Sequence, residues 1–599
     1  MNNPFPARLA ALRDAMHDHG IAAVLIPSAD PHLSEYLPEH WQARAWLSGF
    51  TGSAGTLVVT REHAGLWTDS RYFAQAEHEL AGTGISLMKL RVPHTPEHLE
   101  WLQQQLHGGD VLAVAGDSLA VTTQRQIERR LGDTGASLRT DLDLPGTIWA
   151  DRPALPVAPV FEHDPTYATV SRADKFARLR KAMRKHKASH HLVSSLDDIA
   201  WLTNLRGNDV ECNPVFLAHL LVQTEGRATL FVTRRKLSDA LVAALAADGI
   251  GIADYGSLSS SLQELGTADS LLLDSGRVVS SIAAAIPPAT ILIEATNPST
   301  AFKAVKNSAE LDHIRDVMRL DGAALVRGFR RLEQRLAAGM GTTELDVDTL
   351  LYEERSAQPG YIGESFATIA GYQANGALPH YRATPESHSS LQSKGLLLID
   401  SGGQYLGGTT DITRVLALGE TTAEQRRDAT LVMKGMIALS RARFPQGASG
   451  PQLDALARAP LWASGMDYGH GTGHGVGYFL NVHEGPQSIR PPTPGGALVA
   501  LEPGMISSIE PGLYKPGRHG IRHENLAVVV EAEQTEFGEF LGFETLTLCP
   551  FDRRALEPSL LNPEERAWLD DYHASVRAAL SPLLEGVDLE WLHRHCAPL

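Results

Sequence analysis

Residues 395–418 read GLLLIDSGGQYLGGTTDITRVLAL and contain two apolar segments separated by glycines. The apolar run before Asp400 and the alternating segment after Asp411 predict two neighbouring strands. The turn between them is predicted by four glycines, at positions 402, 403, 407 and 408. Because aspartate is a poor strand residue, two of them in one hairpin indicate a bound cation, a hydrogen-bond network or simple exposure.

A second polar stretch, HGTGHGVGYFLNVHEGP at residues 470–486, contains three histidines and five glycines. His470 and His474 are four residues apart, but the glycines argue against a helix and the stretch does not match HExxH. It also matches neither GxGxxG nor GxxxxGK[ST], which argues against a nucleotide site. One such histidine is more often a structural hydrogen bonder, whereas three in fourteen residues indicate a functional site.

Two glutamates complete the candidate set. Glu510 follows an apolar run in ISSIEPGLY, and Glu524 begins another strand in GIRHENLAVVVEAE. If both lie beside Asp400, Asp411 and His474, four carboxylates share one low-dielectric pocket. Burying four negative charges without compensating positive charge costs too much free energy for a stable fold. Two divalent cations would balance them, and these hard ligands favour Mn²⁺, with Co²⁺ possible. A cation pair about 3.5 to 4 Å apart lowers the pKa of a shared water, which indicates hydrolytic chemistry.

Length and composition describe an ordinary globular protein. The 599 residues predict two to four domains, and 43% are hydrophobic and 21% charged. With 53 Lys and Arg against 70 Asp and Glu, the net charge of −17 argues against nucleic acid or an anionic membrane as partner. Small or neutral partners are expected.

Three scattered cysteines, without CxxC spacing, favour neither a disulfide framework nor a thiolate metal site. The first twenty residues lack a basic segment followed by an apolar one, and no run of 18 apolar residues occurs. We therefore expect a soluble, cytoplasmic protein.

The first half of the chain contains an internal repeat. LRDAMHDHGIAAVLIPS from Leu12 aligns without gaps to LRKAMRKHKASHHLVSS from Leu179. Each copy predicts a helix followed by a buried strand. A proline-rich stretch near residue 160 and a turn before long amphipathic helices near residue 300 predict the domain boundaries. We expect α/β domains over 1–160 and 161–300, then a catalytic domain over 301–599 that ends in a helical extension from about residue 550.

The order Asp, Asp, His, Glu, Glu resembles the metal site of the methionine aminopeptidase and prolidase superfamily, whose catalytic domain has the pita-bread fold. Motifs along the whole chain are similar to the long, three-domain form of the Xaa-Pro aminopeptidase (aminopeptidase P) family. They are SGFTGSAGTLVVT, LWTDSRYF, NLRGNDVECNPVF, KAVKNSAE, GMDYGHG and HGTGHGVGYFLNVHEGP. The resemblance implies an α/β (α+β) protein in which two related creatinase-like domains precede a pita-bread domain.

The resemblance also implies a role for each site residue. Asp400 would be a terminal ligand of one metal, His474 and Glu510 terminal ligands of the other, and Asp411 and Glu524 would bridge the two. Further residues are expected around them. His380 and His483 would contact the scissile carbonyl, and His470 would line the site. Arg71 would reach the bound peptide, and Arg522 would support the bridging carboxylates. His523 is a departure, because relatives usually carry an aliphatic residue there.

The implied reaction is removal of an N-terminal residue that precedes proline, through a bridging hydroxide held by two divalent cations, with Glu510 shuttling the proton. Mn²⁺ is expected, with Co²⁺ or Zn²⁺ as alternatives, and family resemblance suggests a homodimer. The alternatives are a prolidase, which cleaves only dipeptides, and a non-catalytic peptide-binding pita-bread protein. The repeated N-terminal domains argue against the first, and the complete ligand set argues against the second.

Overall fold

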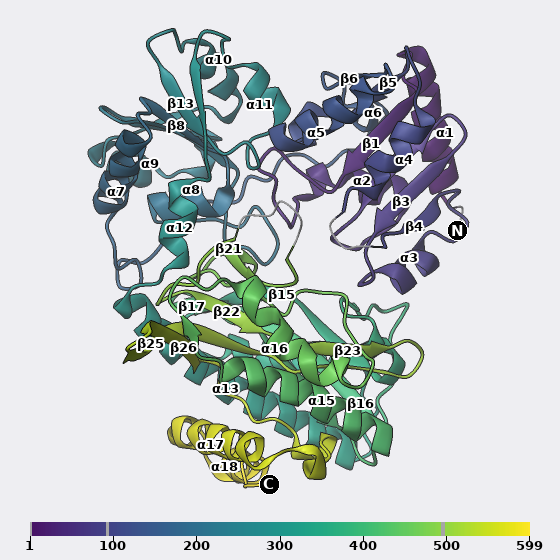
Figure 1. Ribbon diagram of the computed structural model, residues 1–599, viewed down its shortest axis with the longest axis vertical. Helices are drawn as coiled ribbons and strands as arrows, with labels where there is room; N and C mark the ends of the chain where they lie inside the picture. The colour runs from purple at the N-terminus through teal and green to yellow at the C-terminus, as the bar shows by residue number, and fades with distance from the viewer. Residues whose placement is uncertain (1–2, 92–94, 493–497) are drawn as a thin grey trace. The chain divides into compact units, whose positions relative to one another are not determined.

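The computed structural model describes residues 3–91, 95–492 and 498–599. The chain forms two compact units (Figure 1). Unit 1 comprises Met1–His163 and Val170–Thr300, and unit 2 comprises Asp164–Thr169 and Ala301–Leu599. The domain boundaries expected near residues 160 and 300 stay a prediction.

Unit 1 contains two six-stranded mixed sheets of the same design. The first has the order β4-β3-β2-β1-β5-β6, with strands β1 (Ala23–Pro27), β2 (Thr56–Thr60), β3 (Ala64–Thr68), β4 (Ser86–Lys89), β5 (Val111–Ala113) and β6 (Ser137–Arg139). The second has the order β12-β11-β10-β8-β13-β14, with strands β8 (His190–Val193), β10 (Ala218–Gln223), β11 (Ala228–Val232), β12 (Ile250–Ala253), β13 (Ser270–Leu273) and β14 (Ile291–Glu294). In each, the first strand is antiparallel to one neighbour and parallel to the other.

The repeat in the sequence corresponds to a repeat in the structure. Helix α1 (Phe5–Asp18) precedes β1, and helix α7 (Arg172–Lys185) precedes β8. The two helices begin at Phe5 and Arg172, which the sequence alignment places at equivalent positions. Leu12 of α1 and Leu179 of α7 are both buried. Two related α/β domains are therefore present, as the sequence predicts.

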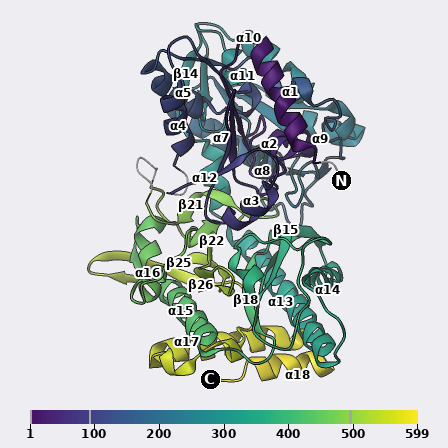
Figure 2. The ribbon, with the colours of Figure 1, turned by 90° about the vertical axis from the view of Figure 1, so that its right-hand side faces the viewer.

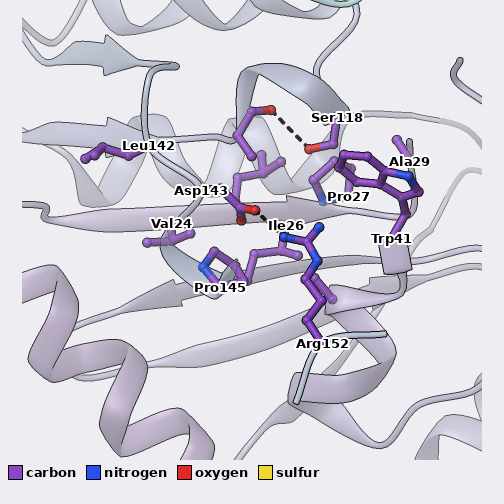
Figure 3. Close-up of a pocket in the computed structure, with 13 residues that line it drawn as sticks. Val24, Ile26, Pro27, Ala29, Trp41, Ser118, Leu142, Asp143, Pro145 and Arg152 are labelled. Atoms are coloured by element: carbon purple, nitrogen blue, oxygen red, sulfur yellow. Dashed lines mark hydrogen bonds and ion pairs between the residues drawn. The ribbon is translucent and has the colours of Figure 1, made fainter. Parts of the chain in front are cut away.

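Short helices connect the strands of unit 1. They are α2 (Ala43–Ser48), α3 (Phe73–Glu79), α4 (Glu97–Gln105), α5 (Val121–Gly132), α6 (Leu144–Ile148), α8 (Leu196–Thr203), α9 (Asp239–Ala247), α10 (Leu258–Gln263) and α11 (Ser280–Ala284). A cavity of about 30 Å³ lies at the ends of β1, β5 and β6. Arg152 points across it to Asp143, 2.6 Å away, beside Trp41 (Figure 3). The space is that of about one water molecule, so this cavity carries no substrate.

Unit 2 is built around two sheets and a hairpin. The smaller sheet contains β15 (Tyr361–Tyr372), β16 (Leu396–Tyr405), β17 (Gly408–Thr409) and β18 (Ile412–Ala417). The larger has the order β19-β26-β25-β22-β20-β21, with β19 (Phe444–Pro445), β20 (Gly473–Gly475), β21 (Glu484–Ile489), β22 (Ile506–Ile509), β25 (Asn525–Thr535) and β26 (Gly538–Thr545). Strands β23 (Gly512–Lys515) and β24 (His519–Arg522) form the hairpin.

Helices cover these sheets. They are α13 (Ser308–Ala337), α14 (Glu344–Ser356), α15 (Ala423–Ser440), α16 (Gly450–Trp462), α17 (Pro563–Leu580) and α18 (Gly586–His595). Helix α12 (Pro298–Ala304) spans the division between the two units at Thr300. Capping boxes begin α13, α15 and α17, which explains why these helices start where they do. Both α17 and α18 pack against α13, and α17 also packs against α15 (Figures 1 and 2). The helical extension expected from the sequence is thus part of the unit 2 core.

The hairpin at residues 395–418 differs in one respect from the prediction. All ten residues of β16 are buried, and the strand continues through Gly402 and Gly403, so these two glycines lie outside the turn. A Cβ at Gly402 would be 2.0 Å from the carbonyl oxygen of Thr410, so glycine is required there because the neighbouring backbone is close. The turn follows at Leu406 and Gly407.

Among the described residues, no helix has both the length and the apolar character needed to cross a membrane. The three cysteines are free thiols, two of them buried.

Candidate metal centre

Neighbouring strands bring the two aspartates together. Asp400 lies in the middle of β16, opposite Thr413 of β18, and Asp411 directly precedes β18. Both side chains are buried. Simple exposure, one of the three explanations for aspartates in this hairpin, is therefore wrong.

The histidine of the centre comes from the glycine-rich stretch. His474 is the central residue of β20, and its backbone N–H donates to Ser508 Oγ at 3.0 Å. A Cβ at Gly473 would be 2.0 Å from the Ser508 carbonyl, and one at Gly475 would be 2.1 Å from the Glu484 carbonyl. These glycines let β20 lie close to both neighbouring strands, which positions the imidazole.

Four of the five predicted ligands converge around His474. Ligand atoms of Asp411, His474 and Glu524 all lie within 4.8 Å of one another. His474 Nε2 is 3.4 Å from Asp411 Oδ2 and 3.6 Å from Glu510 Oε1. Side chains separated by up to 113 residues of sequence therefore share one small volume.

Backbone contacts orient the imidazole. His474 Nδ1 is 2.9 Å from the carbonyl oxygen of Gly475, which only accepts hydrogen bonds, so Nδ1 carries the proton. Nε2 then carries the lone pair that can bind a cation, and it faces the carboxylates of Asp411 and Glu510. A carbonyl that fixes the tautomer in this way is typical of metal-binding histidines.

Arg522 and Thr413 hold the remaining carboxylates. Glu524 accepts a hydrogen bond from Thr413 Oγ1 at 2.6 Å, and Asp400 Oδ2 accepts one from Arg522 Nη2 at 2.5 Å. Arg522 Nε also donates to Thr413 Oγ1 at 3.1 Å. Arg522 therefore contacts Asp400 directly and is linked to Glu524 through Thr413.

The electrostatics show an excess of negative charge. Burial raises the pKa of Asp400 to about 6, despite the opposing charge of Arg522. Burial also raises the pKa of Glu510, and it raises that of Glu524 well above the usual range, with Asp411 adding to the effect. Burial would lower the pKa of His474, but Asp411 and Glu510 raise it to about 9. Without cations, protons must therefore balance the site.

The donor set fits two divalent cations. Oδ1 of Asp400 is buried without a hydrogen-bond partner among the described residues, so one carboxylate oxygen has an open coordination position. Four carboxylates, one imidazole and one arginine leave at least two negative charges uncompensated when the acids are ionised. Oxygen-rich sets of this kind bind hard divalent cations.

Two other predicted site residues, His470 and His483, contact the side chains around this centre. The ring of His483 packs edge-on against that of His474, with 4.3 Å between centroids. His470 Nε2 accepts a hydrogen bond from Tyr514 OH, 2.9 Å away, and Tyr514 in turn accepts one from Arg522 Nη1 at 2.6 Å. The structure thus connects His470 and His483 to the ligand set.

His380 is half-buried in the turn after η5 (Gln373–Ala377), a short 3-10 helix that packs on β23 and β24. A Cβ at Gly520 would lie 1.6 Å from the Gly376 carbonyl, so these backbones touch. Arg71 belongs to unit 1, where Asp69 holds its guanidinium through two hydrogen bonds of 2.8 and 2.7 Å.

Two residues that contact the site had not been predicted from the sequence. Thr413 bonds to Glu524 and Arg522, and Tyr514 bonds to Arg522 and His470. A signal for Thr413 existed, because it follows Asp411 by two residues and so shares its face of the strand. Tyr514 ends the motif EPGLY and had no distinguishing pattern.

Family models match along the chain. Two models of the creatinase/prolidase N-terminal domain match residues 8–152 and 151–310, metallopeptidase family M24 matches residues 312–531, and the C-terminal region of peptidase M24 matches residues 539–599. The five predicted ligands all fall within the M24 match.

Individual relatives match over the full length. A probable Xaa-Pro aminopeptidase P of Laccaria bicolor is 40% identical over 609 residues, covering 99% of this chain and 93% of the relative, and one of Neurospora crassa is 40% identical over 613 residues, covering 99% and 89%. The crystal structure of X-prolyl aminopeptidase from Caenorhabditis elegans, described as a cytosolic enzyme with a di-nuclear active site, superposes with a TM-score of 0.94 at 33% identity, covering 99% of each chain. Full-length identity of this extent places the chain in the Xaa-Pro aminopeptidase P family of M24 metallopeptidases.

Proposed function

We propose that this enzyme removes the N-terminal residue from peptides with proline in the second position. The observation that carries the proposal is the convergence of Asp411, His474 and Glu524 within 4.8 Å, beside Glu510 and Asp400. Relatives named Xaa-Pro aminopeptidase P over the full chain support the substrate class.

Two divalent cations are proposed as cofactors. Asp400 would hold one, His474 and Glu510 the other, and Asp411 and Glu524 would bridge them. When bound, the pair supplies Lewis acidity toward the scissile carbonyl and lowers the pKa of a water molecule. Mn²⁺ is proposed because the ligands are hard, with Co²⁺ and Zn²⁺ as the alternatives to test.

Glu510 is proposed to move the proton. Its carboxylate lies 3.6 Å from His474 Nε2 at the centre of the ligand set, where it would take a proton from the attacking water and give it to the leaving proline nitrogen. That transfer balances hydrolysis, because the water adds its oxygen to the carbonyl carbon and the C–N bond breaks.

His483 and His380 are proposed to bind the scissile carbonyl and stabilise the oxyanion that develops on it. The edge-on contact of His483 with His474 supports this for His483. His470 is proposed to line the site through its hydrogen bond with Tyr514. Arg71 stays the proposed peptide contact from unit 1.

Cleavage before proline would require a dedicated binding pocket. The bond before proline is a tertiary amide without an N–H, and the ring fixes the following φ. Peptidases that bind an extended backbone through its N–H groups therefore bind such substrates poorly.

Cleavage of Arg-Pro-Pro, Arg-Ala-Pro and Gly-Pro by the metal-depleted protein, with and without Mn²⁺, tests this function. We expect Mn²⁺-dependent release of arginine from Arg-Pro-Pro alone. Cleavage of Gly-Pro alone would indicate a prolidase. If none of the peptides is cleaved, the result would indicate a non-catalytic binding protein.

Glu510→Gln should lower kcat by about 10²-fold or more. Glu533→Gln, at an exposed position of β25, is the matched control. An active Glu510→Gln variant would contradict the proton-transfer role.

We also propose a cytoplasmic homodimer with domains over 1–160, 161–300 and 301–599. The free thiols and the cytosolic relative support the compartment. Light scattering on the purified chain would determine the oligomeric state, and a monomer would contradict the dimer.

A further inference from the structure

Arg414 follows Asp411 by three residues on β18 and is 1% exposed. Its guanidinium donates hydrogen bonds to five residues in unit 2. They are Thr413 (carbonyl, 2.9 Å), Glu524 (carbonyl, 2.6 Å), Asn525 (Oδ1, 2.8 Å), Cys549 (carbonyl, 2.8 and 3.3 Å) and Tyr572 (hydroxyl, 2.9 Å). All five acceptors are neutral oxygens. Three of them are backbone carbonyls, so this buried cation fixes backbone segments and two side chains through hydrogen bonds to neutral oxygens.

On one side, these bonds reach the predicted bridging ligand. Arg414 Nη1 donates to the carbonyls of both Thr413 and Glu524. The Thr413 carbonyl also accepts the Glu524 backbone N–H at 3.2 Å, and Thr413 Oγ1 donates to the Glu524 carboxylate. Arg414 therefore closes the network that sets where the Glu524 carboxylate lies.

On the other side, the bonds reach the C-terminal region. Cys549 and Phe551 follow β26, and Tyr572 lies on α17. The guanidinium carbon of Arg414 is 3.8 Å from the centroid of the Phe551 ring, in cation–π geometry. Tyr572 OH contacts the Cys549 carbonyl at 2.9 Å, so the helix and the preceding segment meet at the same point.

We propose that Arg414 is a positioning residue through which the C-terminal region, residues 539–599, sets the cation affinity of the metal centre. The inference rests on the proposed function, because it takes Glu524 as a bridging ligand. The C-terminal helices then contribute to cation binding although none of their side chains is a proposed ligand.

The test measures Mn²⁺ binding to the metal-depleted full chain by calorimetry, together with kcat and KM on Arg-Pro-Pro. Arg414→Lys keeps the charge but cannot reach both the Glu524 carbonyl and the Cys549 carbonyl. Arg355→Lys is the matched control, because Arg355 is equally buried in unit 2 and pairs with Asp321, 2.7 Å away, but contacts no proposed ligand. Tyr572→Phe removes only one hydroxyl from the network.

We expect Arg414→Lys to bind Mn²⁺ about 10- to 100-fold more weakly, with kcat recovering at saturating Mn²⁺ and KM for the peptide unchanged. Arg355→Lys should lose thermal stability but keep the wild-type affinity. Wild-type affinity in Arg414→Lys, or equal losses in both variants, would overturn the proposal. If Arg414→Lys does not fold, Tyr572→Phe decides: weaker Mn²⁺ binding supports the proposal and unchanged binding overturns it.

The two proposals fail in different ways. A wild-type protein that binds two Mn²⁺ ions with an affinity sensitive to Arg414, but cleaves no Xaa-Pro peptide, would contradict the proposed function and support the inference. A wild-type protein that binds no Mn²⁺ would overturn both.

Discussion

Asp400 accepts a hydrogen bond from Arg522 Nη2 at 2.5 Å through Oδ2, whereas its Oδ1 is buried without a partner among the described residues. One oxygen is thus held by the arginine and the other is oriented for a ligand. Arg522→Lys retains a positive charge but loses the other two donors, to Thr413 and Tyr514.

We expect Arg522→Lys to weaken cation binding about 10- to 100-fold, because Asp400 loses its fixed orientation. Calorimetric titration of the metal-depleted protein with Mn²⁺ measures this. Arg518→Lys, on the exposed turn of the same hairpin, should bind as the wild type does; an unaltered affinity in Arg522→Lys would contradict the role.

Removal of cations should lower thermal stability, because the acidic cluster then loses its compensating charge. Restoring Mn²⁺ at 100 times its dissociation constant should raise the free energy of unfolding by about 2.7 kcal/mol. Differential scanning calorimetry with and without chelator measures the change. Asp411→Asn, which removes a proposed bridging ligand, should show a reduced response, and an equal response would argue against that ligand.

The carboxyl group of Asp428, which is not a proposed metal ligand, should make the stability of the fold depend on pH. Burial would raise its pKa, but hydrogen bonds from His519, Lys515 and Arg427 lower it to about 2, against a usual value of 3.8. A lowered carboxyl pKa stabilises the fold above the usual pKa, and this stability is lost as the pH falls toward the folded-state pKa.

Asp428→Asn should therefore lower the melting temperature at pH 7, and the difference from wild type should shrink between pH 4 and pH 2. Thermal unfolding at a series of pH values measures it. A difference that stays constant down to pH 2 would show that the loss comes from packing and not from the charge.

His523 should be replaceable with a gain in stability. Both of its ring nitrogens are buried, neither forms a hydrogen bond of good geometry among the described residues, and the Ala429 backbone is the only hydrogen-bonding group that acts on its pKa, which burial lowers to about 3. An unsatisfied buried polar group costs about 1–3 kcal/mol. We expect His523→Leu to raise the melting temperature and His523→Asn to lower it, and a lowered value for the leucine variant would indicate that the imidazole packing on Phe551 is worth more than this cost.

Gly520→Ala should be disruptive, because the new Cβ would lie 1.6 Å from the Gly376 carbonyl. The contact holds η5, which precedes His380. Overpacking costs about 1–3 kcal/mol or more, so we expect a lower melting temperature and a higher KM for Arg-Pro-Pro. Gly363→Ala on β15, where a Cβ meets nothing within 4 Å, is the control; equal behaviour of the two variants would contradict the close contact.

Local patterns in the sequence determined much of this fold. The repeat that equates Leu12 with Leu179 predicted two related α/β domains, because helix and strand periodicity are properties of neighbouring residues. The same patterns predicted neighbouring strands at the two aspartates, and Asp400 lies in β16 while Asp411 directly precedes β18. Glycines 402 and 403 were assigned to the wrong place, because their requirement comes from a neighbouring backbone that no local pattern reports.

Tertiary structure alone decided how the site is supported. The convergence of His474 and Glu524 with Asp411, the pairing of Arg522 with Asp400, and the bonds from Arg414 to both Glu524 and Cys549 join segments far apart in the chain. Hydrogen bonds and pKa values depend on distances between such segments. The sequence determines which side chains are available, and folding determines which of them meet.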